Sequence, residues 1–262
     1  MQLCFHMEQA LISFVIPAYN EQEMIAACVE SIVLECYWDN YAEQIYSVGR
    51  SKITGDYEII VVDNGSDDFT ADCAMAAGAT VVYHQPIKGT NVARQMGFEH
   101  SQGDLIAFID ADSVMPAGWL RAVKLALHDA NVVAVSGPPH FIGVSKSRAF
   151  VVALYYTVSG FLNHFWPMTQ GGNCVVRRNA MDAINGFDTS FTFYGDDADT
   201  AKRLSKVGLT KLVQGMWIWQ SARRMKHDGW LKVAWVYVAN YVWVQLTGRS
   251  FTKVSHDVRQ ED

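Results

Sequence analysis

The sequence has no C-x-x-C pair, and its cysteines are few and odd in number: Cys4, Cys28, Cys36, Cys73 and Cys174. A disulfide framework uses an even set of cysteines and a structural zinc site uses clustered ligands, so the sequence favours neither. This cysteine usage is typical of a reducing compartment. Residues 1–10, MQLCFHMEQA, also lack the charged start and apolar centre of a secretory signal. We therefore expect a cytoplasmic protein.

A basic excess is missing as well. The chain has 21 Lys and Arg against 27 Asp and Glu, which gives a formal net charge of −6. Proteins that bind nucleic acid usually present a basic surface to the phosphates, so we expect no nucleic-acid partner. A length of 262 residues suits one large α/β domain or two small ones.

The chain contains two aromatic-rich apolar stretches, and neither is a plain membrane span. Residues 233–246 are too short to cross a bilayer, which takes about 20 apolar residues. Residues 149–168 approach that length but include Ser159, Asn163 and His164. Two interpretations stay open. We favour core helices for most of these residues; the alternative is helices lying peripherally in a membrane interface, on its cytoplasmic face, where Trp and Tyr are favoured.

Buried strands alternate with helices through the first half of the chain. Apolar runs that end in turn residues predict strands at 12–17, 58–63, 80–84, 105–110 and 132–137. Helical spacing of apolar residues predicts helices from about 25 onward and at 66–77, 91–100 and 118–128. This alternation predicts an α/β fold with a mostly parallel, Rossmann-like sheet flanked by helices. The connection over 36–57 is long for such a fold and reads as a helical insertion.

Polar residues gather where these strands end, in PAYNE, VVDNGSDD and IDADS. Ligands of open α/β sheets bind outside the carboxyl ends of the strands, so these segments predict one ligand site. Asp110 and Asp112 are two like charges at one strand end, which need a compensating cation, proton or solvent. Two hard oxygen donors beside a crevice suit Mg²⁺ or Mn²⁺. The alternative is a solvated turn that caps the next helix.

Cationic and acidic residues around this pair suit a sugar nucleotide. Asp63 closes a buried strand, where its carboxylate can accept a hydrogen bond from a base or a ribose. Lys88 and Arg94 can supply positive charge for a diphosphate. Taken singly, each of the two cations would also fit an exposed turn or an exposed helix face.

Two segments downstream complete the set of candidates. Gly171 and Gly172 allow the backbone to approach a ligand closely. Asp196 and Asp197 precede a helical pattern, where acids are favoured by the helix dipole. A carboxylate there can instead take a proton from an attacking hydroxyl. The residues alone leave these two roles open.

In their order along the chain, these motifs resemble the inverting nucleotide-sugar glycosyltransferases of family 2, which have the GT-A fold. The similarity runs from about residue 12 to about residue 230. The matching segments are IPAYNE, EIIVVDNGSDD, KGTNVARQMG, GDLIAFIDADS, GGNCVVRRNAMDAINGFD and GDDADTAKRL. The resemblance implies a single GT-A domain over 1–262, with a nucleotide-binding half at about 12–137. An acceptor-binding, partly helical half would follow at about 138–262.

The resemblance also implies a role for each matching residue. The nucleotide-binding positions would be Pro17, Tyr19, Glu21, Asp63, Lys88, Arg94 and Asp110. Asp112 would hold the metal, Mn²⁺ or Mg²⁺, and Asp197 would be the catalytic base. The sugar and acceptor side would consist of Gly171, Gly172, Asn173 and Asp196. The implied enzyme is a hexosyltransferase that moves a sugar, UDP-linked in our expectation, to a saccharide or lipid-linked acceptor with inversion.

Some positions depart from the family pattern. Asp196 stands where glutamate is usual, and Gln95 stands where asparagine often follows the arginine. The Q-x-x-R-W motif of processive synthases is absent, and residues 217–230 read WIWQSARRMKHDGW instead. We therefore expect a non-processive enzyme. Arg223, Arg224 and His227 of this segment are candidates to close over the diphosphate or metal, although a solvated basic turn is the better interpretation for His227.

Two rival functions remain. FIDADSV also resembles the start of haloacid dehalogenase-type phosphatases, in which Asp110 would be the nucleophile and Asp112 an acid–base group. GDDADT resembles the last acidic motif of that superfamily, which would follow a strand. That interpretation leaves PAYNE and VVDNGSDD unexplained, so we rank it below the transferase. A non-catalytic sugar-nucleotide-binding protein is disfavoured because Asp110, Asp112 and Asp197 are all intact.

Overall fold

A computed structural model describes residues 11–46, 57–163, 167–191 and 194–252. Its main sheet has seven strands in the order β3-β2-β1-β4-β8-β6-β9. Strands β3, β2, β1 and β4 run parallel, β8 runs antiparallel between β4 and β6, and β9 is parallel to β6. The strands are β1 (Ile12–Ala18), β2 (Tyr57–Asp63), β3 (Val81–His84), β4 (Leu105–Ile109), β6 (Val132–Ser136), β8 (Asn173–Arg177) and β9 (Leu209–Leu212).

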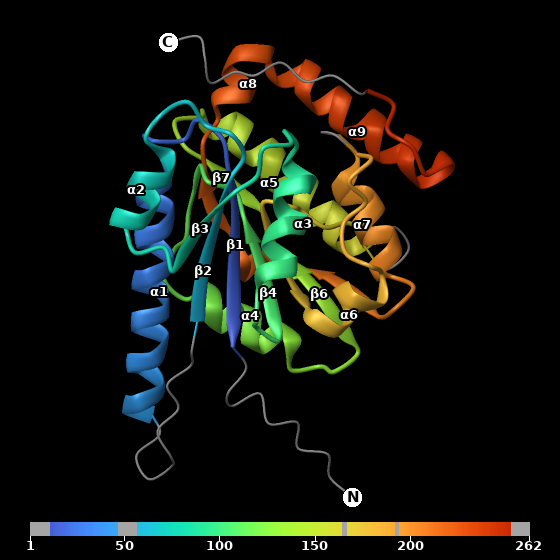
Figure 1. Ribbon diagram of the computed structural model, residues 1–262. Coiled ribbons are helices and arrows are strands. Elements are labelled where there is room, and N and C mark those ends of the chain that lie inside the picture. The colour runs from blue at the N-terminus through green and yellow to red at the C-terminus, as the bar shows by residue number, and fades with distance from the viewer. Residues whose placement is uncertain (1–10, 47–56, 164–166, 192–193, 253–262) are drawn as a thin grey trace, which may run out of the picture.

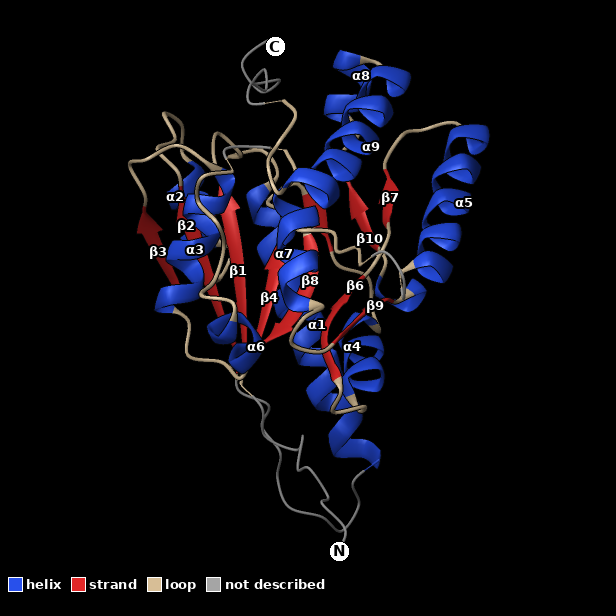
Figure 2. Cartoon of the chain, turned by 90° about the vertical axis from the view of Figure 1, so that its right-hand side faces the viewer, coloured by secondary structure: helices blue, strands red, loops and turns tan. Residues whose placement is uncertain are grey.

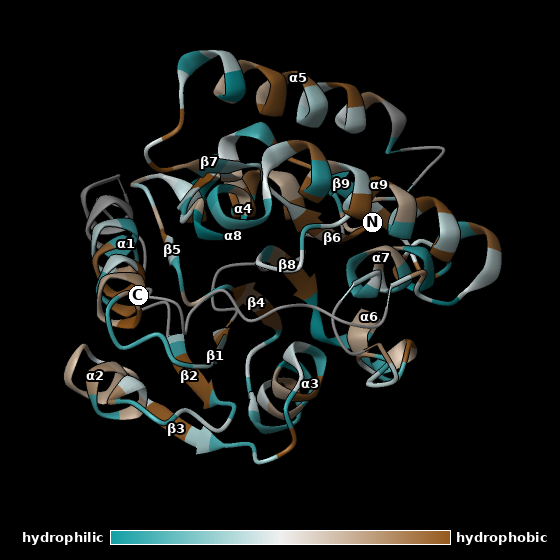
Figure 3. Ribbon diagram, turned by 90° about the horizontal axis from the view of Figure 1, so that it is seen from above, coloured by the Kyte–Doolittle hydropathy of each residue, from teal (hydrophilic) through white to brown (hydrophobic). Residues whose placement is uncertain are grey.

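Helices cover both faces of this sheet (Figures 1 and 3). The helices on one face are α1 (Ile25–Tyr46), α2 (Thr70–Ala76) and α4 (Trp119–Leu127), whose buried side chains share a core cluster with Phe14 and Ile16 of β1. The helices on the other face are α3 (Thr90–His100), α6 (Arg178–Ala183) and α7 (Asp196–Leu204), which pack on Phe108 of β4. The central strands are buried on both sides, as continuous apolar runs predict.

A second sheet of three short strands lies beside the carboxyl end of β4. Its order is β5-β10-β7, with bounds β5 (Ser113–Val114), β7 (Pro139–Phe141) and β10 (Ile218–Gln220). A 3₁₀ turn, η1 (Gln214–Met216), precedes β10. Strand β10 pairs with β5 directly after the two aspartates, through Gln220 opposite Ser113. A segment more than 100 residues downstream is thereby held against the predicted metal site.

The remaining helices are α5 (Lys146–Leu162), α8 (Arg223–Asp228) and α9 (Trp230–Thr247). In Figure 2, α5 stands at the edge of the molecule, while α8 and α9 extend above the strand ends. No helix in the described part of the chain is long and apolar enough to cross a membrane.

The predicted strands and the mostly parallel α/β architecture are confirmed, with strand ends shifted by a residue. The helix predicted at 66–77 is shorter, because the Asp68 carboxylate accepts from the Thr70 amide and holds the preceding residues in a turn. The segment that we read as an insertion of its own begins as a continuation of α1, which runs to Tyr46. Residues 47–56 of that segment lie outside the described residues.

The preference for core helices in the aromatic stretches is wrong for most of their residues. On α5, Phe150 is 68% exposed and Phe161 is 81% exposed. On α9, Trp235 is 70% exposed and Leu231 is 88% exposed. Both helices are apolar around much of their circumference, so helical periodicity could not reveal that only a narrow stripe meets the body. His164, also part of this expectation, lies outside the described residues.

Candidate active site

The predicted site residues gather at the carboxyl edge of the main sheet. Parallel pairing places Ala18, the last residue of β1, opposite Asp63, the last residue of β2. Strand β4 runs parallel to β1 on its other side and ends immediately before Asp110. The three polar segments that follow these strands therefore lie at one edge of the sheet, as expected for an open α/β sheet.

Arg94, on α3, joins the acids of two distant segments. Its guanidinium Nη2 donates to Asp110 Oδ1 at 3.0 Å, and Nη1 donates to Asp196 Oδ2 at 2.8 Å. Asp197 Oδ1 lies 3.8 Å from the same Nη1. Arg94 is only 4% exposed. We expected it beside the nucleobase and the diphosphate, but in the structure its guanidinium lies against three carboxylates. A buried charge is stable only when paired in this way.

Two glycines make room for these carboxylates. A Cβ on Gly172 would clash with the Asp110 carboxylate, and a Cβ on Gly171 would clash with Asp197 Oδ1 and the Arg94 guanidinium. The Asp110 amide also donates to the Gly172 carbonyl at 3.1 Å. We expected the backbone at Gly171 and Gly172 to approach a ligand closely. In the structure it approaches the carboxylates of Asp110 and Asp197 instead.

Asp112 lies among other acids, and its negative charge is partly compensated by an arginine that is distant in sequence. Desolvation, together with the charges of Asp110 and Glu21, raises the pKa of Asp112 to about 7, although Arg223 lowers it. Arg223 Nη2 lies 3.7 Å from Asp112 Oδ2 and donates to Glu21 Oε2 at 2.6 Å. Glu21 is 6% exposed, so this predicted nucleotide contact is engaged with α8 in the structure.

Asp197 has the environment of a proton acceptor. It is the second residue of α7, and its side chain is 36% exposed. Desolvation and the neighbouring Asp196 raise the pKa of Asp197 to about 7, while Arg94 and the Gly171 amide lower it. A carboxyl group that titrates near neutral pH is matched to accepting a proton from a hydroxyl. Asp196, expected on the sugar side, is nearly buried and paired with Arg94.

The part of the candidate site where we expect a nucleotide contains a cation held on an aromatic ring. Lys88 Nζ donates to Tyr19 Oη at 2.6 Å and lies 3.9 Å from the ring centroid. Asp63 accepts from the Ser66 amide at 3.1 Å, and His84 Nδ1 lies 3.2 Å from its carboxylate. Pro17 stands one residue before the end of β1 at this edge. These contacts place an aromatic face, a positive charge and a carboxylate along the same sheet edge.

Asn173 is not placed as expected. It is fully buried in β8, where its Oδ1 accepts from Trp119 Nε1 at 3.0 Å and its Nδ2 donates to the Met216 carbonyl. Both polar atoms of the side chain are thus used inside the protein. Asn173 fixes β8 against α4 in this structure, because a buried amide needs its partners, and it does not face the crevice.

Gln220 is the site residue that the sequence analysis missed. Its Nε2 donates to Asp110 Oδ2 at 3.2 Å, so Asp110 is held by Arg94 on one oxygen and by Gln220 on the other. Gln220 ends β10, a strand of three residues. A strand that short has no hydrophobic period, and only its position three residues before the candidate Arg223 pointed to this region.

The donor set fits a divalent ion that takes further ligands from a substrate. Asp110 and Asp112 are hard oxygen donors, and desolvation, together with like charges, raises the pKa of Asp112. In the described ranges, no group of three or more His, Cys, Asp and Glu side chains is arranged to hold a metal by itself. Mg²⁺ commonly binds through one or two carboxylates with phosphates and water completing its shell. The residues present match that pattern.

Comparison with known proteins identifies the family to which the chain belongs. The family model described as "Glycosyl transferase family 2" matches residues 13–184, which is more than half of the chain. The chain therefore belongs to glycosyltransferase family 2. The matched residues include Asp63, Arg94, Asp110 and Asp112, whereas Asp197 and the helices α7, α8 and α9 lie beyond them.

Curated relatives match about half of the chain. Glycosyltransferase AglE from Haloferax volcanii is 30% identical over 135 residues, which cover 50% of this chain and 40% of AglE. An undecaprenyl-phosphate 4-deoxy-4-formamido-L-arabinose transferase from Serratia proteamaculans is 36% identical over 129 residues, 47% of this chain and 35% of that protein. The aligned part of the chain thus spans well under half the length of these relatives.

Solved structures extend the similarity to most of the fold. A mannosyltransferase from Pyrobaculum calidifontis, in complex with GDP-Man and Mn²⁺, superimposes with a TM-score of 0.63 and 21% identity, covering 92% of this chain and 65% of that one. Glucosyl-3-phosphoglycerate synthase from Mycobacterium tuberculosis, with Mn²⁺, UDP-glucose and phosphoglyceric acid, gives 0.60 and 20% identity, with coverage of 91% and 79%. The fold is GT-A.

The fold also removes support for a haloacid dehalogenase-type phosphatase. In that interpretation the strand before Asp110 begins the fold, but β4 follows β1 and β2 and pairs with β1. The described residues directly before α7 form a turn and not the strand that such an enzyme would place before its last acidic motif. The family match over the same aspartates leaves the phosphatase disfavoured.

Proposed function

We propose that this protein transfers a hexosyl group from a nucleoside-diphosphate sugar, with UDP as the nucleotide, to a hydroxyl of an acceptor. The observation that carries the proposal is the Arg94 bridge, which joins Asp110 on the donor side to the Asp196–Asp197 pair. A transferase needs a donor site and a proton acceptor at a fixed separation, and one buried guanidinium can hold both.

Asp197 is the proposed base. Its carboxylate takes the proton of the acceptor hydroxyl, and the acceptor oxygen attacks the anomeric carbon on the face opposite the diphosphate. The bond between that carbon and the diphosphate oxygen breaks, its electron pair leaves with the nucleoside diphosphate, and the configuration inverts in one step. A pKa near 7 for Asp197 supports this role, because such a group accepts a proton and later releases it.

The donor is proposed to lie along the sheet edge. Pro17, Tyr19 and Asp63 would face the nucleoside, with Lys88 close to the diphosphate. Asp112, with Asp110 beside it, would hold Mn²⁺ or Mg²⁺, which when bound supplies positive charge against the leaving diphosphate. Glu21 and Arg94 are assigned to positioning, since each is buried and paired with a charged residue. Gly171 and Gly172 leave room for the acids.

The acceptor is proposed to be a saccharide or a lipid-linked molecule, taken up by the half of the domain after about residue 138. One relative's name includes undecaprenyl-phosphate, which supports a lipid-linked acceptor as one choice. Absence of the Q-x-x-R-W motif supports a non-processive reaction. Buried free thiols at Cys28, Cys36 and Cys174 support a reducing, cytoplasmic location. The location that we propose includes peripheral contact with the inner face of a membrane.

A donor panel tests the proposal. The purified chain is mixed with UDP-, GDP- and TDP-linked hexoses in Mn²⁺, and thermal unfolding is followed, because only ligands of the native state raise Tm. We expect one nucleotide class to raise Tm with Mn²⁺ present, and the rise to vanish in Asp112→Asn but to persist in the exposed control Asp182→Asn. Phosphate release from simple esters without any response to sugar nucleotides would refute the transferase.

A further inference from the structure

Helices α5 and α9 account for half of the large apolar side chains exposed on the described surface. These helices contain 17 and 18 residues, yet they carry 13 of the 25 exposed large hydrophobic side chains of the described residues. The most exposed on α5 are Phe150, Leu154 and Phe161, and on α9 they are Leu231, Trp235 and Leu246. A concentration of this kind marks an interaction surface rather than ordinary scattered exposure.

Each helix meets the body of the protein through few residues. Of the described side chains of α5, only Ser159 is buried, and the described part of α9 buries Val233, Asn240 and Val244. Figure 2 shows α5 set apart at the edge of the fold, and Figure 3 shows apolar colour recurring along both helices. Most of the remaining described side chains of each helix are exposed, which is unfavourable for aromatic side chains unless another phase covers them.

This surface borders the proposed base. Val244 of α9 shares a core cluster with Phe191 and Ala198, and Ala198 follows Asp197 on α7. Lys202 Nζ of α7 donates to the Gln245 carbonyl of α9 at 2.7 Å. An acceptor held at α9 would therefore lie close to the reacting site.

Both helices carry tyrosines: Tyr155 and Tyr156 on α5, and Tyr237 and Tyr241 on α9. Desolvation raises the pKa of Tyr156 on α5, with Tyr155, Tyr237 of α9 and Asp197 adding to it. Desolvation also raises the pKa of Tyr241 on α9, with Tyr155 adding to it.

The same region is positively charged, against the sign of the chain as a whole. Helix α5 and residues 223–252 contain seven Lys and Arg and one acid, Asp228, a sum of +6. The net charge of the whole chain is −6, so the residues outside these segments carry a net charge of −12. Lys146, Arg148, Lys226 and Lys232 of these segments are exposed. The charge complements an anionic partner.

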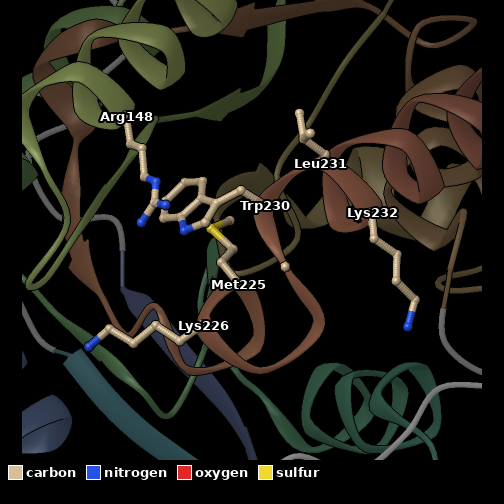
Figure 4. Close-up of a pocket in the computed structure, with 7 residues that line it drawn as sticks. Arg148, Met225, Lys226, Trp230, Leu231 and Lys232 are labelled. Atoms are coloured by element: carbon tan, nitrogen blue, oxygen red, sulfur yellow. The ribbon is translucent and has the colours of Figure 1, made fainter.

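A basic hollow lies where the amino ends of the two helices meet. Its volume is about 500 Å³, and Figure 4 shows Arg148, Met225, Lys226 and Trp230 around it. The Arg148 guanidinium carbon lies 5.4 Å from the centroid of the Trp230 ring. A cation beside an indole, with Lys226 in the same lining, makes a boundary between polar and apolar groups, which is the environment in which Trp is enriched at membrane surfaces.

We propose that α5, α8 and α9 form a face that docks onto an anionic lipid surface, with its aromatic and aliphatic side chains in the headgroup boundary. Lys146, Arg148, Lys226 and Lys232 then lie at the lipid phosphates. Helices rich in aromatic and aliphatic side chains, with basic residues beside them, can lie parallel to a membrane surface in this way. The proposal deepens the proposed function, on which it rests only in placing a lipid-linked acceptor beside Asp197.

Vesicle flotation of the full chain tests the docking. Vesicles of phosphatidylcholine with phosphatidylglycerol are compared with vesicles of phosphatidylcholine alone. We expect at least about tenfold tighter binding to the anionic vesicles and a loss of most binding in 0.5 M salt, because surface charges are then screened. Recovery of the protein in the soluble fraction with both vesicles overturns the proposal.

Matched variants locate the face. Leu231→Glu with Leu246→Glu is expected to weaken vesicle binding at least about tenfold, while Leu125→Glu, 69% exposed on α4, leaves it unchanged. Lys226→Glu with Lys232→Glu is expected to abolish the preference for anionic lipid, and the exposed control Lys206→Glu is expected to retain it. Equal binding by the Leu variants and their control overturns the proposal.

Two further readouts separate other outcomes. A different occupant of the face would give a different pattern. The wild-type protein would dimerise in size-exclusion chromatography and would not bind vesicles, and the leucine variants would be monomers. In that case the face joins two copies, and the lipid proposal is wrong. Donor-induced Tm shifts are measured on the same variants. A retained donor response with lost vesicle binding supports docking, whereas a protein that binds vesicles without responding to any donor contradicts the proposed function alone.

Discussion

Arg94 Nη1 donates to Asp196 Oδ2 at 2.8 Å, across 102 residues of sequence. The other terminal nitrogen of the guanidinium binds Asp110, so one side chain fixes a strand end and a helix start relative to each other. Arginine suits this position because its planar fork can bind two carboxylates at once, which lysine cannot do. The separation between the donor side and the proposed base depends on this residue.

Arg94→Lys is therefore expected to keep the fold but lower kcat by about 10- to 100-fold, as misplacement of reacting groups does. Lysine keeps the positive charge, but its single ammonium cannot contact Asp110 and Asp196 and also stay beside Asp197. Its effect on the pKa of Asp197 should therefore be weaker, and the pH at which the variant gains activity should move upward. Steady-state rates as a function of pH check both effects. The exposed Arg121→Lys is the control. Unchanged kcat and an unchanged pH profile in Arg94→Lys would show that the bridge has no positioning role.

Activity should depend on pH through the ionisation of Asp197. The base must be deprotonated, and the pKa of Asp197 is raised to about 7 by desolvation and Asp196. We expect kcat/KM to rise with pH between about 6 and 8 and then to level off. A pH–rate profile at saturating metal measures this. A flat profile between pH 5 and pH 8 would contradict a base in this environment.

The same shift predicts that the base lowers stability. The pKa of the Asp197 carboxyl is about 7 in the folded protein and near its ordinary value of 3.8 in the unfolded chain. The folded state therefore holds this proton more tightly, and stability falls as pH rises from about 4 to about 7. Asp197→Asn should raise Tm at pH 8, by about 2–4 °C for each 1 kcal/mol gained. At pH 4 the gain should disappear, and a loss of stability at pH 8 would oppose this account.

Gly172→Ala should disrupt the acid pair. A Cβ at this position would overlap the Asp110 carboxylate, which Arg94 and Gln220 hold in place. We expect donor-induced stabilisation to be lost and turnover to fall by at least about 100-fold, since misplaced groups have effects of this size. Gly160→Ala is the control, because its Cβ would make ordinary contact with Leu212. Full activity in Gly172→Ala would show that the crevice tolerates movement of Asp110.

The sequence predicted the parallel half of the fold because each strand there is a separate apolar run followed by its own helix. The antiparallel strand β8 was not assigned, since the partners that bury Asn173 and Cys174 are fixed only by packing. Strands β5, β7 and β10 have two or three residues and leave no periodic pattern.

At the site, the sequence predicted which residues gather but not how their charges pair. Asp110, Asp112 and Asp197 stood out as acids at strand or helix ends, where local rules apply. The partners of Arg94 and Glu21 lie 16 to 202 residues away, and no local rule relates such distances. The sequence could not decide whether α5 and α9 are buried or exposed for a related reason. A helix with apolar residues around most of its circumference has the same kind of sequence in a protein core and on an apolar surface.

Asp197→Asn tests the central claim most directly. Release of nucleoside diphosphate in the presence of Mn²⁺, the stabilising sugar nucleotide and an acceptor is compared in wild type, Asp197→Asn and Asp182→Asn, with donor binding measured by calorimetry. We expect Asp197→Asn to bind the donor as wild type does and to lose about 10²- to 10⁴-fold in turnover, the range that general bases contribute. Turnover within a few-fold of wild type in Asp197→Asn, with intact donor binding, would contradict the assignment of the base.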